Sequence, residues 1–233
     1  MDIAAFVPLS LSDHEGRVAA VVFVCGCNFR CPFCHNPELV LPEREDRGLV
    51  DGRDIVRQLS ARRGFLDSVV VTGGEPTLQP DLGSFLAEIR GLGLATKLDT
   101  NGSRPDIVSS LLEKNLVDYV AMDVKAPRAR YAEYAGAGVD LAAIERSIAI
   151  LRERAPDYEF RTTAAPGLAE GDLVAIGEWL RGAKRYVLQP FRVPPEKGLV
   201  DPAWETRDAL ASEALREIRT RIASLVRDGG VRG

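Results

Sequence analysis

From residue 18 onward, the chain alternates short runs of β-branched residues with longer amphipathic segments. Such runs favour strands, and apolar residues spaced three and four apart favour helices. The predicted strands cover 18–24, 69–72, 94–100, 118–124, 158–164 and 185–191. The predicted helices cover 52–63, 81–91, 105–115, 139–154 and 171–181. This alternation predicts an α/β fold with a parallel sheet and right-handed crossovers.

The number of strand–helix units decides between a closed and an open barrel. A closed parallel barrel has about eight units, whereas the last of these units ends near residue 191. We therefore predict a partial, open parallel (β/α)6 barrel within a core domain of residues 1–200. Apolar residues at helical spacing between 204 and 226 predict a long C-terminal amphipathic helix, so that residues 201–233 pack on this core.

Composition excludes some functions without changing the predicted fold. The chain has 233 residues, 45% of them hydrophobic, with 30 basic and 34 acidic side chains and a formal net charge of −4. No segment concentrates positive charge, so nucleic-acid binding is not expected. The N-terminal segment lacks a basic region before a long apolar run, and the apolar run at 18–25 is too short to cross a bilayer. We expect a cytoplasmic protein without membrane contact.

The cysteines are confined to positions 25, 27, 31 and 34. Disulfides across such short loops would constrain the unfolded chain very little, so metal binding explains them better. Cys27, Cys31 and Cys34 have a C-x3-C-x2-C spacing on a predicted loop. Iron–sulfur cubanes usually have four cysteine ligands, so three thiolates would leave one iron open to another ligand. Cys25 would close that position, and we interpret it as a small buried or reactive thiol.

A zinc site is the alternative interpretation of these cysteines. Cys27, Cys31, Cys34 and His35 form a Cys3His set of plausible composition for structural zinc. His35 directly follows Cys34, which makes it awkward for both side chains to reach one tetrahedral ion. Colour separates the two cases, because an iron–sulfur protein is brown and a zinc protein colourless.

Polar motifs follow the predicted strands at the end where parallel barrels carry their active sites. The stretch 72–76 reads TGGEP, and its two glycines would let a ligand approach the backbone closely. The next strand ends in Asp99, Thr100 and Asn101, which could bind a ribose or carboxylate or could simply form a turn.

The later strands continue this pattern. Asp123 and Lys125 are two residues apart and are predicted to face the same side of their strand. Arg161 offers a fixed cation suited to a carboxylate, and Gln189 ends the last predicted strand. These motifs share one end of the sheet, which supports a common binding site.

The cysteine spacing, with Phe33 before the last cysteine, resembles the signature of the radical S-adenosylmethionine (SAM) superfamily. The resemblance implies a 4Fe-4S cluster whose open iron binds SAM, and whose electron cleaves SAM to a 5′-deoxyadenosyl radical. No catalytic side chain is implied beyond the cluster and cofactor. The implied SAM-binding residues come from the cysteine loop and the strand ends: Phe33, Asn36, Gly73, Gly74, Glu75, Thr77, Asp99, Asn101, Asp123, Lys125, Arg161 and Gln189.

Within this superfamily, residues 8–195 resemble the activating proteins of anaerobic ribonucleoside-triphosphate reductase, notably in GCNFRCPFCHNP, MDVKAP and LQPF. This implies that the adenosyl radical generates a glycyl radical on the large reductase subunit, and that a flavodoxin- or ferredoxin-type protein donates the electron. Two positions depart from related proteins. Cys25 stands where a non-thiol residue is more common, and Arg192 stands where pyruvate formate-lyase activases tend to have histidine.

Two alternatives share the same motifs. The chain could activate another glycyl-radical enzyme, or it could modify a pterin or deazapurine, as 7-carboxy-7-deazaguanine synthase does. The paired acids Asp99 and Asp123 would also repel the cofactor carboxylate without a counter-ion. We therefore predict that a monovalent cation can bind between them.

Overall fold

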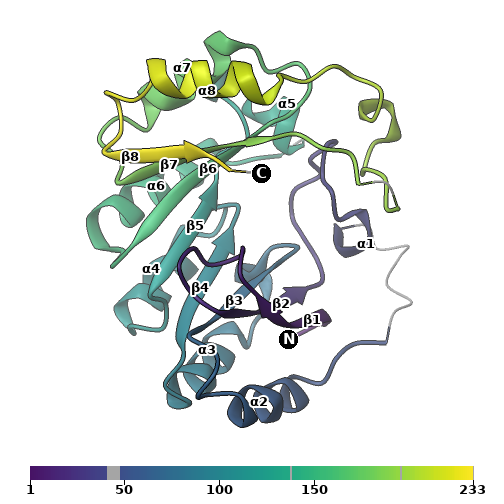
Figure 1. The fold of residues 1–233 in the computed structure, drawn as a ribbon, viewed down its shortest axis with the longest axis vertical. Coiled ribbons are helices and arrows are strands. Elements are labelled where there is room, and N and C mark those ends of the chain that lie inside the picture. The colour runs from purple at the N-terminus through teal and green to yellow at the C-terminus, as the bar shows by residue number, and fades with distance from the viewer. Residues whose placement is uncertain (41–47, 137, 195, 233) are drawn as a thin grey trace.

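The computed structural model describes residues 1–40, 48–136, 138–194 and 196–232. They form one eight-stranded sheet whose strands lie in chain order, with β1 antiparallel to β2 and every later pair parallel. The strands are β1 Ile3–Ser10, β2 Ala19–Val24, β3 Ser68–Gly73, β4 Ala95–Thr100, β5 Tyr119–Asp123, β6 Tyr158–Ala164, β7 Arg185–Pro190 and β8 Asp228–Val231. The two edge strands, β1 and β8, do not pair with each other, so the barrel is open, as predicted (Figure 1).

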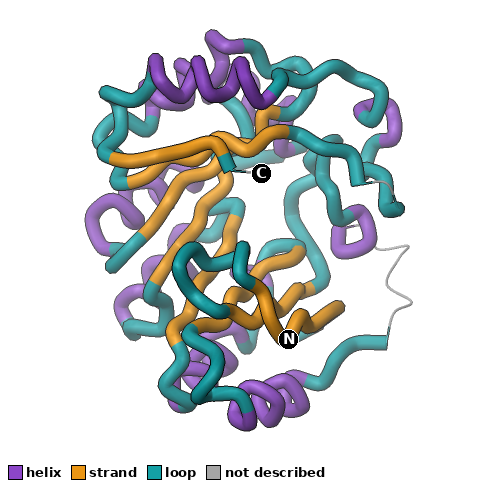
Figure 2. The backbone as a smooth tube through the Cα atoms, in the orientation of Figure 1, coloured by secondary structure: helices purple, strands orange, loops and turns teal. Residues whose placement is uncertain are grey.

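Most helices follow the strands and cover the outer side of the curved sheet, whereas α1 follows the cysteine loop and lies apart from them (Figures 1 and 2). They are α1 Pro37–Val40, α2 Gly52–Ala61, α3 Leu82–Gly91, α4 Pro105–Glu113, α5 Tyr131–Ala135, α6 Leu141–Arg154, α7 Glu170–Trp179 and α8 Ser212–Arg221. Short 3-10 turns are η2 Pro76–Leu78, η3 Arg128–Arg130 and η4 Pro202–Trp204. The six predicted strands correspond to β2–β7, and the five predicted helices to α2, α3, α4, α6 and α7.

Local chemistry explains where several helices begin. The Asp51 side chain accepts a hydrogen bond from the Arg53 N–H at the start of α2, and Asp140 does the same for the Ala143 N–H at α6. Pro105 occupies the first turn of α4, where its missing N–H costs nothing. These caps lie at the loop-to-helix turns that follow the strand ends.

The two faces of the sheet differ in polarity because side chains alternate along a strand. On the helix side, residues such as Leu98, Val120 and Phe160 belong to the main buried core. The opposite face carries an apolar patch of Ala19, Val21 and Val70 with Phe23. In β4–β6, however, the intervening positions are Lys97, Asp99, Asp123, Glu159 and Arg161, so much of the barrel interior is charged.

The C-terminal segment differs from its prediction. Instead of one helix over 204–226, Trp204 belongs to η4 and α8 covers only Ser212–Arg221. Of the apolar residues whose spacing predicted it, Ile218 of α8 and Ile222 just after it are buried. Leu225 is also buried, but in a turn where its carbonyl accepts the Gly182 N–H. The apolar spacing was thus real, but tertiary packing ends the helix early.

The edge strands β1 and β8 were not predicted. β8 reads DGGV, and glycines are poor strand formers. A Cβ on Gly229 would lie 2.1 Å from the Tyr186 carbonyl oxygen, so this close pairing with β7 needs glycine. Among the described residues, no helix is long and apolar enough to cross a membrane.

Candidate active site

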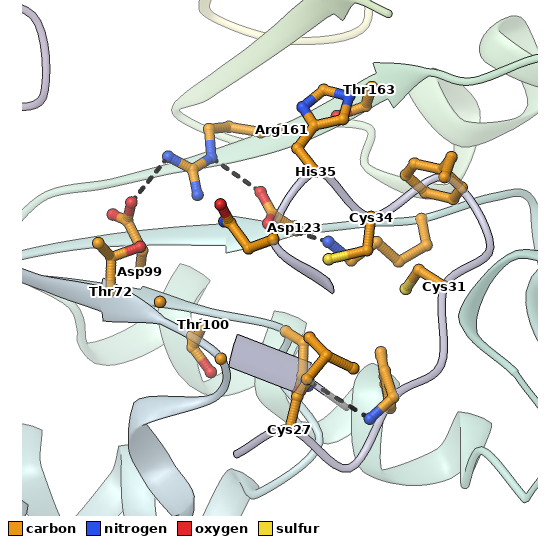
Figure 3. Close-up of a pocket in the computed structure, with 18 residues that line it drawn as sticks. Cys27, Cys31, Cys34, His35, Thr72, Asp99, Thr100, Asp123, Arg161 and Thr163 are labelled. Atoms are coloured by element: carbon orange, nitrogen blue, oxygen red, sulfur yellow. Dashed lines mark hydrogen bonds and ion pairs between the residues drawn. The ribbon is translucent and has the colours of Figure 1, made fainter. Parts of the chain in front are cut away.

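The cysteine loop leaves the end of β2 and forms one wall of a pocket of about 190 Å³. Cys27, Cys31 and Cys34 all line this pocket, and none of them forms a disulfide (Figure 3). Backbone hydrogen bonds fix the loop at both sides. The Arg30 N–H donates to the Ala135 carbonyl, and the Cys34 carbonyl accepts the Val200 N–H. The structure thus places the three predicted cluster ligands around one pocket.

Burial controls the protonation of these thiols. It raises the pKa of Cys27 to about 11 and that of Cys31 to about 12, and it raises the pKa of Cys34 as well. Lys125 opposes this effect at each thiol through its positive charge. Three sulfur donors around one cavity, with Cys31 buried and the other two half-buried, fit an iron–sulfur cluster, which would bind the thiolates and release their protons.

The end of β3 forms the pocket wall beside the cysteine loop. Gly73 and Gly74 line the pocket, and Gly73 has a φ of 116°. A Cβ on Gly74 would lie 1.9 Å from the Gly26 carbonyl oxygen, so the wall and the cysteine loop touch through backbone alone. These glycines therefore bring the strand end against the cysteine loop and leave it accessible from the pocket.

Glu75 lies behind this wall rather than in it. It is fully buried, and its oxygens accept hydrogen bonds from the Thr77 N–H at 3.0 Å, the Thr100 hydroxyl at 2.7 Å and the Asn101 N–H at 2.6 Å. Burial raises the pKa of Glu75, and these hydrogen bonds oppose that effect. Thr77 also donates its hydroxyl to the same oxygen at 2.5 Å. The structure thus places Glu75 and Thr77 outside the pocket lining, where they connect the ends of β3 and β4.

A charged cluster around Arg161 forms another part of the pocket wall (Figure 3). The Arg161 Nε is 2.8 Å from Asp123 and its Nη1 is 3.2 Å from Asp99. Lys125 Nζ lies 3.0 Å from the other Asp123 oxygen, and Lys97 Nζ lies 3.3 Å from Asp99. Asp123 and Lys125 both line the pocket, as the strand periodicity predicted.

These contacts settle the charge state of the cluster. Burial alone would raise the pKa of Asp123, but Arg161 and Lys125 hold it at about 2. Asp123 in turn raises the pKa values of Lys125 and Arg161, against the effect of burial. All three groups are therefore ionised near neutral pH. A bound anion would compete with Asp99 and Asp123 for Arg161, which makes this cluster suited to a carboxylate.

Further predicted residues complete the pocket. Asn101 lines it and donates to the Asn28 side chain at 3.0 Å. Asn36 and Phe33 also line it, and the Phe33 ring packs against Tyr134 at a centroid distance of 6.0 Å.

Gln189 lies elsewhere, in a neighbouring cavity of about 220 Å³. His35 and Thr163 line both cavities, so the two adjoin. Arg192 and Arg232 line the second cavity together with Gln189. Gln189 therefore does not line the main pocket, but the cavity that it lines adjoins that pocket.

Several lining residues were not predicted: Phe29, Val40, Thr72 and Thr163. Thr163 could have been found, because it is two residues from Arg161 on β6 and so faces the same side. Phe29 and Val40 carry no chemical signal in the sequence. In the described part of the chain, no three His, Cys, Asp or Glu side chains converge closely enough to hold a single metal ion.

The sequence profile of the radical SAM superfamily matches residues 21–180. The chain belongs to the radical SAM superfamily. The match covers the cysteine loop, the glycine wall and the charged cluster, so it includes the whole pocket except what Gln189 and its neighbours contribute. This membership decides between the two interpretations of the cysteines in favour of the 4Fe-4S cluster over zinc, and it implies SAM as the second cofactor.

Relatives of this radical SAM protein have more specific names. A Methanocaldococcus jannaschii protein named as a glycyl-radical enzyme activating enzyme is 32% identical over 195 residues, which cover 81% of this chain and 79% of the relative. A Staphylococcus aureus pyruvate formate-lyase-activating enzyme is 26% identical over 204 residues, covering 80% of this chain and 77% of the relative. A Methanopyrus kandleri 7-carboxy-7-deazaguanine synthase is 32% identical over 132 residues, covering 48% and 51%.

Solved radical SAM structures have the same fold. Streptococcus suis SuiB bound to S-adenosylmethionine superposes with a TM-score of 0.67 at 16% identity, covering 89% of this chain and 48% of SuiB. Escherichia coli coproporphyrinogen III oxidase, titled a radical SAM enzyme, gives a TM-score of 0.61 at 12% identity and covers 87% and 52%. The chain spans about half the length of these proteins, and the likeness supports the open-barrel fold.

Proposed function

We propose that this radical SAM protein activates a glycyl-radical enzyme. When bound and given one electron, the cluster and SAM would supply a 5′-deoxyadenosyl radical for removing a hydrogen atom from a glycine Cα of the partner. The main support is the similarity, over about four-fifths of the chain, to the Methanocaldococcus jannaschii protein named for this activity. An open barrel supports the proposal because a protein loop, rather than a small molecule, must reach the pocket.

The residues of the pocket have distinct roles in this proposal. Cys27, Cys31 and Cys34 would hold the cluster. The backbone of Gly73 and Gly74 would accept hydrogen bonds from the methionyl amine. The side chains beside the cofactor would be those of Phe33, Asn36 and Asn101, with Gln189 in the adjoining cavity. The methionyl carboxylate would be bound by Arg161 and Lys125, with Asp99 and Asp123 positioning them.

Glu75 and Thr77 have an indirect role in this proposal. Their mutual hydrogen bonds, with those to Thr100 and Asn101, connect the ends of β3 and β4 behind the pocket. They would hold the glycine wall in place instead of touching the cofactor. Residues 201–233 complete the proposed organisation as a C-terminal segment on the core of residues 1–200.

The finer part of the proposal names the partner as the large subunit of anaerobic ribonucleoside-triphosphate reductase. The support is the resemblance of residues 8–195 and the presence of Arg192 where formate-lyase activases tend to have histidine. A flavodoxin- or ferredoxin-type protein in the cytoplasm would donate the electron.

A monovalent cation is a separate part of the proposal. The Asp99 and Asp123 carboxylates already face Arg161, Lys97 and Lys125 in the structure. A cation would be needed when the cofactor carboxylate draws Arg161 or Lys125 away from these acids. SAM affinity should then rise with added potassium, and affinity that is unchanged after removal of every monovalent metal cation would contradict it.

The deciding experiment is anaerobic. The protein is reconstituted with iron and sulfide, reduced with dithionite and given SAM, and 5′-deoxyadenosine is measured with and without the candidate reductase subunit. Cysteine-dependent cleavage with a glycyl radical signal in electron paramagnetic resonance (EPR) is the expected result. Cys31→Ala should abolish both signals, whereas Cys25→Ser should leave the cluster intact.

The other outcomes lead to other functions. Cleavage of SAM without a radical on the reductase, but with one on another glycyl-radical enzyme, would retain the activase and change its partner. Cleavage that proceeds only with a pterin or deazapurine substrate would favour the small-molecule enzymes. That second candidate is favoured by the similarity of half the chain to 7-carboxy-7-deazaguanine synthase.

A further inference from the structure

The Asn101 side chain hydrogen-bonds one of the three predicted cluster ligands. Its amide nitrogen, Nδ2, lies 3.8 Å from the Cys27 sulfur, and both residues line the main pocket. The Phe29 N–H is a second donor to the same sulfur, at 3.4 Å. Phe29 belongs to the cysteine loop, whereas Asn101 directly follows β4. Asn101 therefore connects the end of the sheet to a cysteine of the loop.

The neighbours of Asn101 fix which end of its amide faces the sulfur. The Ser103 backbone N–H, which can only donate, lies 2.9 Å from Asn101 Oδ1. Because the amide oxygen is held by Ser103, the NH2 group occupies the other branch of the side chain. Nδ2 donates to the Asn28 side-chain oxygen at 3.0 Å. An NH2 group has two hydrogens, so the second one is available to the Cys27 sulfur.

A buried carboxylate holds the backbone of this donor. Glu75 Oε2 accepts the Asn101 N–H at 2.6 Å, and Glu75 Oε1 accepts the Thr100 hydroxyl at 2.7 Å. Asn101 is 6% exposed and Glu75 is fully buried. The backbone N–H and both ends of the side-chain amide thus have partners that are not thiols. The donor is held in place without help from the cysteines, as residues that support metal ligands usually are.

We propose that the Asn101 amide donates a hydrogen bond to the Cys27 sulfur when this sulfur is a ligand of the 4Fe-4S cluster, and thereby raises the reduction potential of the cluster. Hydrogen bonds to cysteinyl sulfurs tune the potential of such clusters. Reduction adds one negative charge to the cluster, which strengthens a hydrogen bond from a neutral donor. The bond therefore stabilises the reduced state more than the oxidised state. This role acts through Cys27 and is separate from any contact with SAM.

The inference rests on the cofactors of the superfamily and not on the proposed partner, so it can fail or succeed independently of the proposed function. Its test is the potential of the reconstituted full chain, followed by EPR during a redox titration without SAM. In Asn101→Leu, which has a similar shape but no N–H group, we expect the ratio of reduced to oxidised cluster at a fixed potential to fall about tenfold. This corresponds to about 59 mV for a one-electron couple.

Asn36→Leu is the matched control. It makes the same substitution in the lining of the same pocket. The Asn36 backbone N–H, which faces the Cys34 sulfur, is kept in this variant. We therefore expect its potential to equal that of the wild type. An equal shift in Asn36→Leu and Asn101→Leu would overturn the proposal, because the loss of any polar side chain from the pocket would then explain it.

Asn101→Ser tests the same hydrogen bond with less disturbance of the turn. The serine hydroxyl oxygen can accept the Ser103 N–H, as in turns that begin with serine, but the shorter side chain cannot reach the Cys27 sulfur. We expect its potential to fall with that of Asn101→Leu. If Asn101→Leu binds too little cluster to titrate, Asn101→Ser decides alone. A wild-type potential in Asn101→Ser contradicts a hydrogen bond from this amide, as does a wild-type potential in Asn101→Leu.

Discussion

At the carboxyl ends of the strands, charged groups line a pocket together with thiols and glycines, whereas the charged groups at the amino ends line a cavity without them. The pocket end has three thiols, the glycine wall and the Arg161 cluster. At the other end, the tip of the β1–β2 hairpin, residues 11–18, enters the barrel. There His14 Nδ1 lies 3.0 Å from the Ser68 hydroxyl, and Lys97 Nζ donates to the Asp13 carbonyl.

The hairpin tip also reaches across the open barrel to the residue that follows β8. Glu15 at the hairpin tip pairs with Arg232 at 2.8 Å and lies 3.6 Å from Arg185. Arg232 in turn pairs with the buried Glu159 at 2.9 Å. The comparison indicates that interior charge alone does not mark a binding site. The site is where charged groups line a cavity together with the three thiols and the glycine wall.

The largest effect is expected from removing Arg161, the cation that contacts both pocket acids, Asp99 and Asp123. Arg161→Met leaves Asp99 and Asp123 to Lys97 and Lys125 alone, and loss of one partner from a buried ion pair costs about 3 kcal/mol or more. We expect the unfolding free energy of the cluster-free chain to fall by about that amount in urea titration, together with weaker SAM binding by calorimetry.

Arg161→Lys is the control that separates the effect of the positive charge from the effect of the guanidinium's shape. Lysine keeps the positive charge but cannot reach both carboxylates as the planar guanidinium does. It should recover most of the stability and less of the SAM affinity. If Arg161→Met were as stable as the wild type, the pocket end would tolerate acids without this partner. The difference between the two ends of the barrel would then not hold.

The next largest effect concerns the backbone contact between the glycine wall and the cysteine loop. Gly74→Ala would place a Cβ 1.9 Å from the Gly26 carbonyl oxygen, so one of the two segments must move. Overpacking of this kind costs about 1–3 kcal/mol. We expect a lower melting temperature and reduced cluster uptake, measured by absorbance after reconstitution.

Gly91→Ala gives the matched control, because a Cβ there meets nothing within 4 Å. It should leave cluster uptake unchanged. Normal uptake in Gly74→Ala would mean that the two segments can separate without affecting the cysteines.

The amino end should respond to pH through His14. Burial, with Lys97 and Arg17, lowers the pKa of His14 to about 4, while Asp99 and Glu159 oppose this effect. Between pH 6.5 and 4, the unfolded chain binds a proton that the folded chain does not, so stability falls as pH falls through this range. The expected loss is about 2 kcal/mol, measured by urea titration across these pH values.

His14→Gln can still hydrogen-bond Ser68 but does not titrate. Its stability should therefore fall less than that of the wild type between pH 6.5 and 4. Parallel stability curves for the two proteins would assign the acid sensitivity to other groups.

The smallest effect is expected at Glu15. Its side chain is 68% exposed, and exposed ion pairs contribute little because water screens them. Glu15→Gln should change the unfolding free energy by about 0.5 kcal/mol or less, with unchanged SAM cleavage. A loss as large as that of Arg161→Met would show that the hairpin tip is as critical as the pocket cluster.

Sequence reasoning predicted the core strands because their β-branched runs are local features. It also predicted Cys27, Cys31 and Cys34, whose spacing is itself the signal. It missed β8, where Gly229 has no strand propensity and is required only by the nearby Tyr186 carbonyl. Such close approaches depend on tertiary structure and leave no local pattern.

Side-chain direction was harder to predict than strand position. Glu75 follows the two pocket glycines in sequence, yet its carboxylate does not line the pocket and instead accepts hydrogen bonds from Thr100 and Asn101 behind it. Asp99 and Asp123 were expected to need a counter-ion, but their distance to Arg161 could be known only from the register of β4–β6.

The contact between Glu15 and Arg232 has a consequence for synthesis. The two residues are separated by 217 positions, so the hairpin made among the first residues waits for almost the whole chain before it meets this partner. Until then, Glu159 lacks the arginine that neutralises it in the core. A nascent chain can fold its local strand–helix units during translation, but the charged interior is completed only once residue 232 has been made and can reach residue 15. Contacts between such distant residues also slow folding.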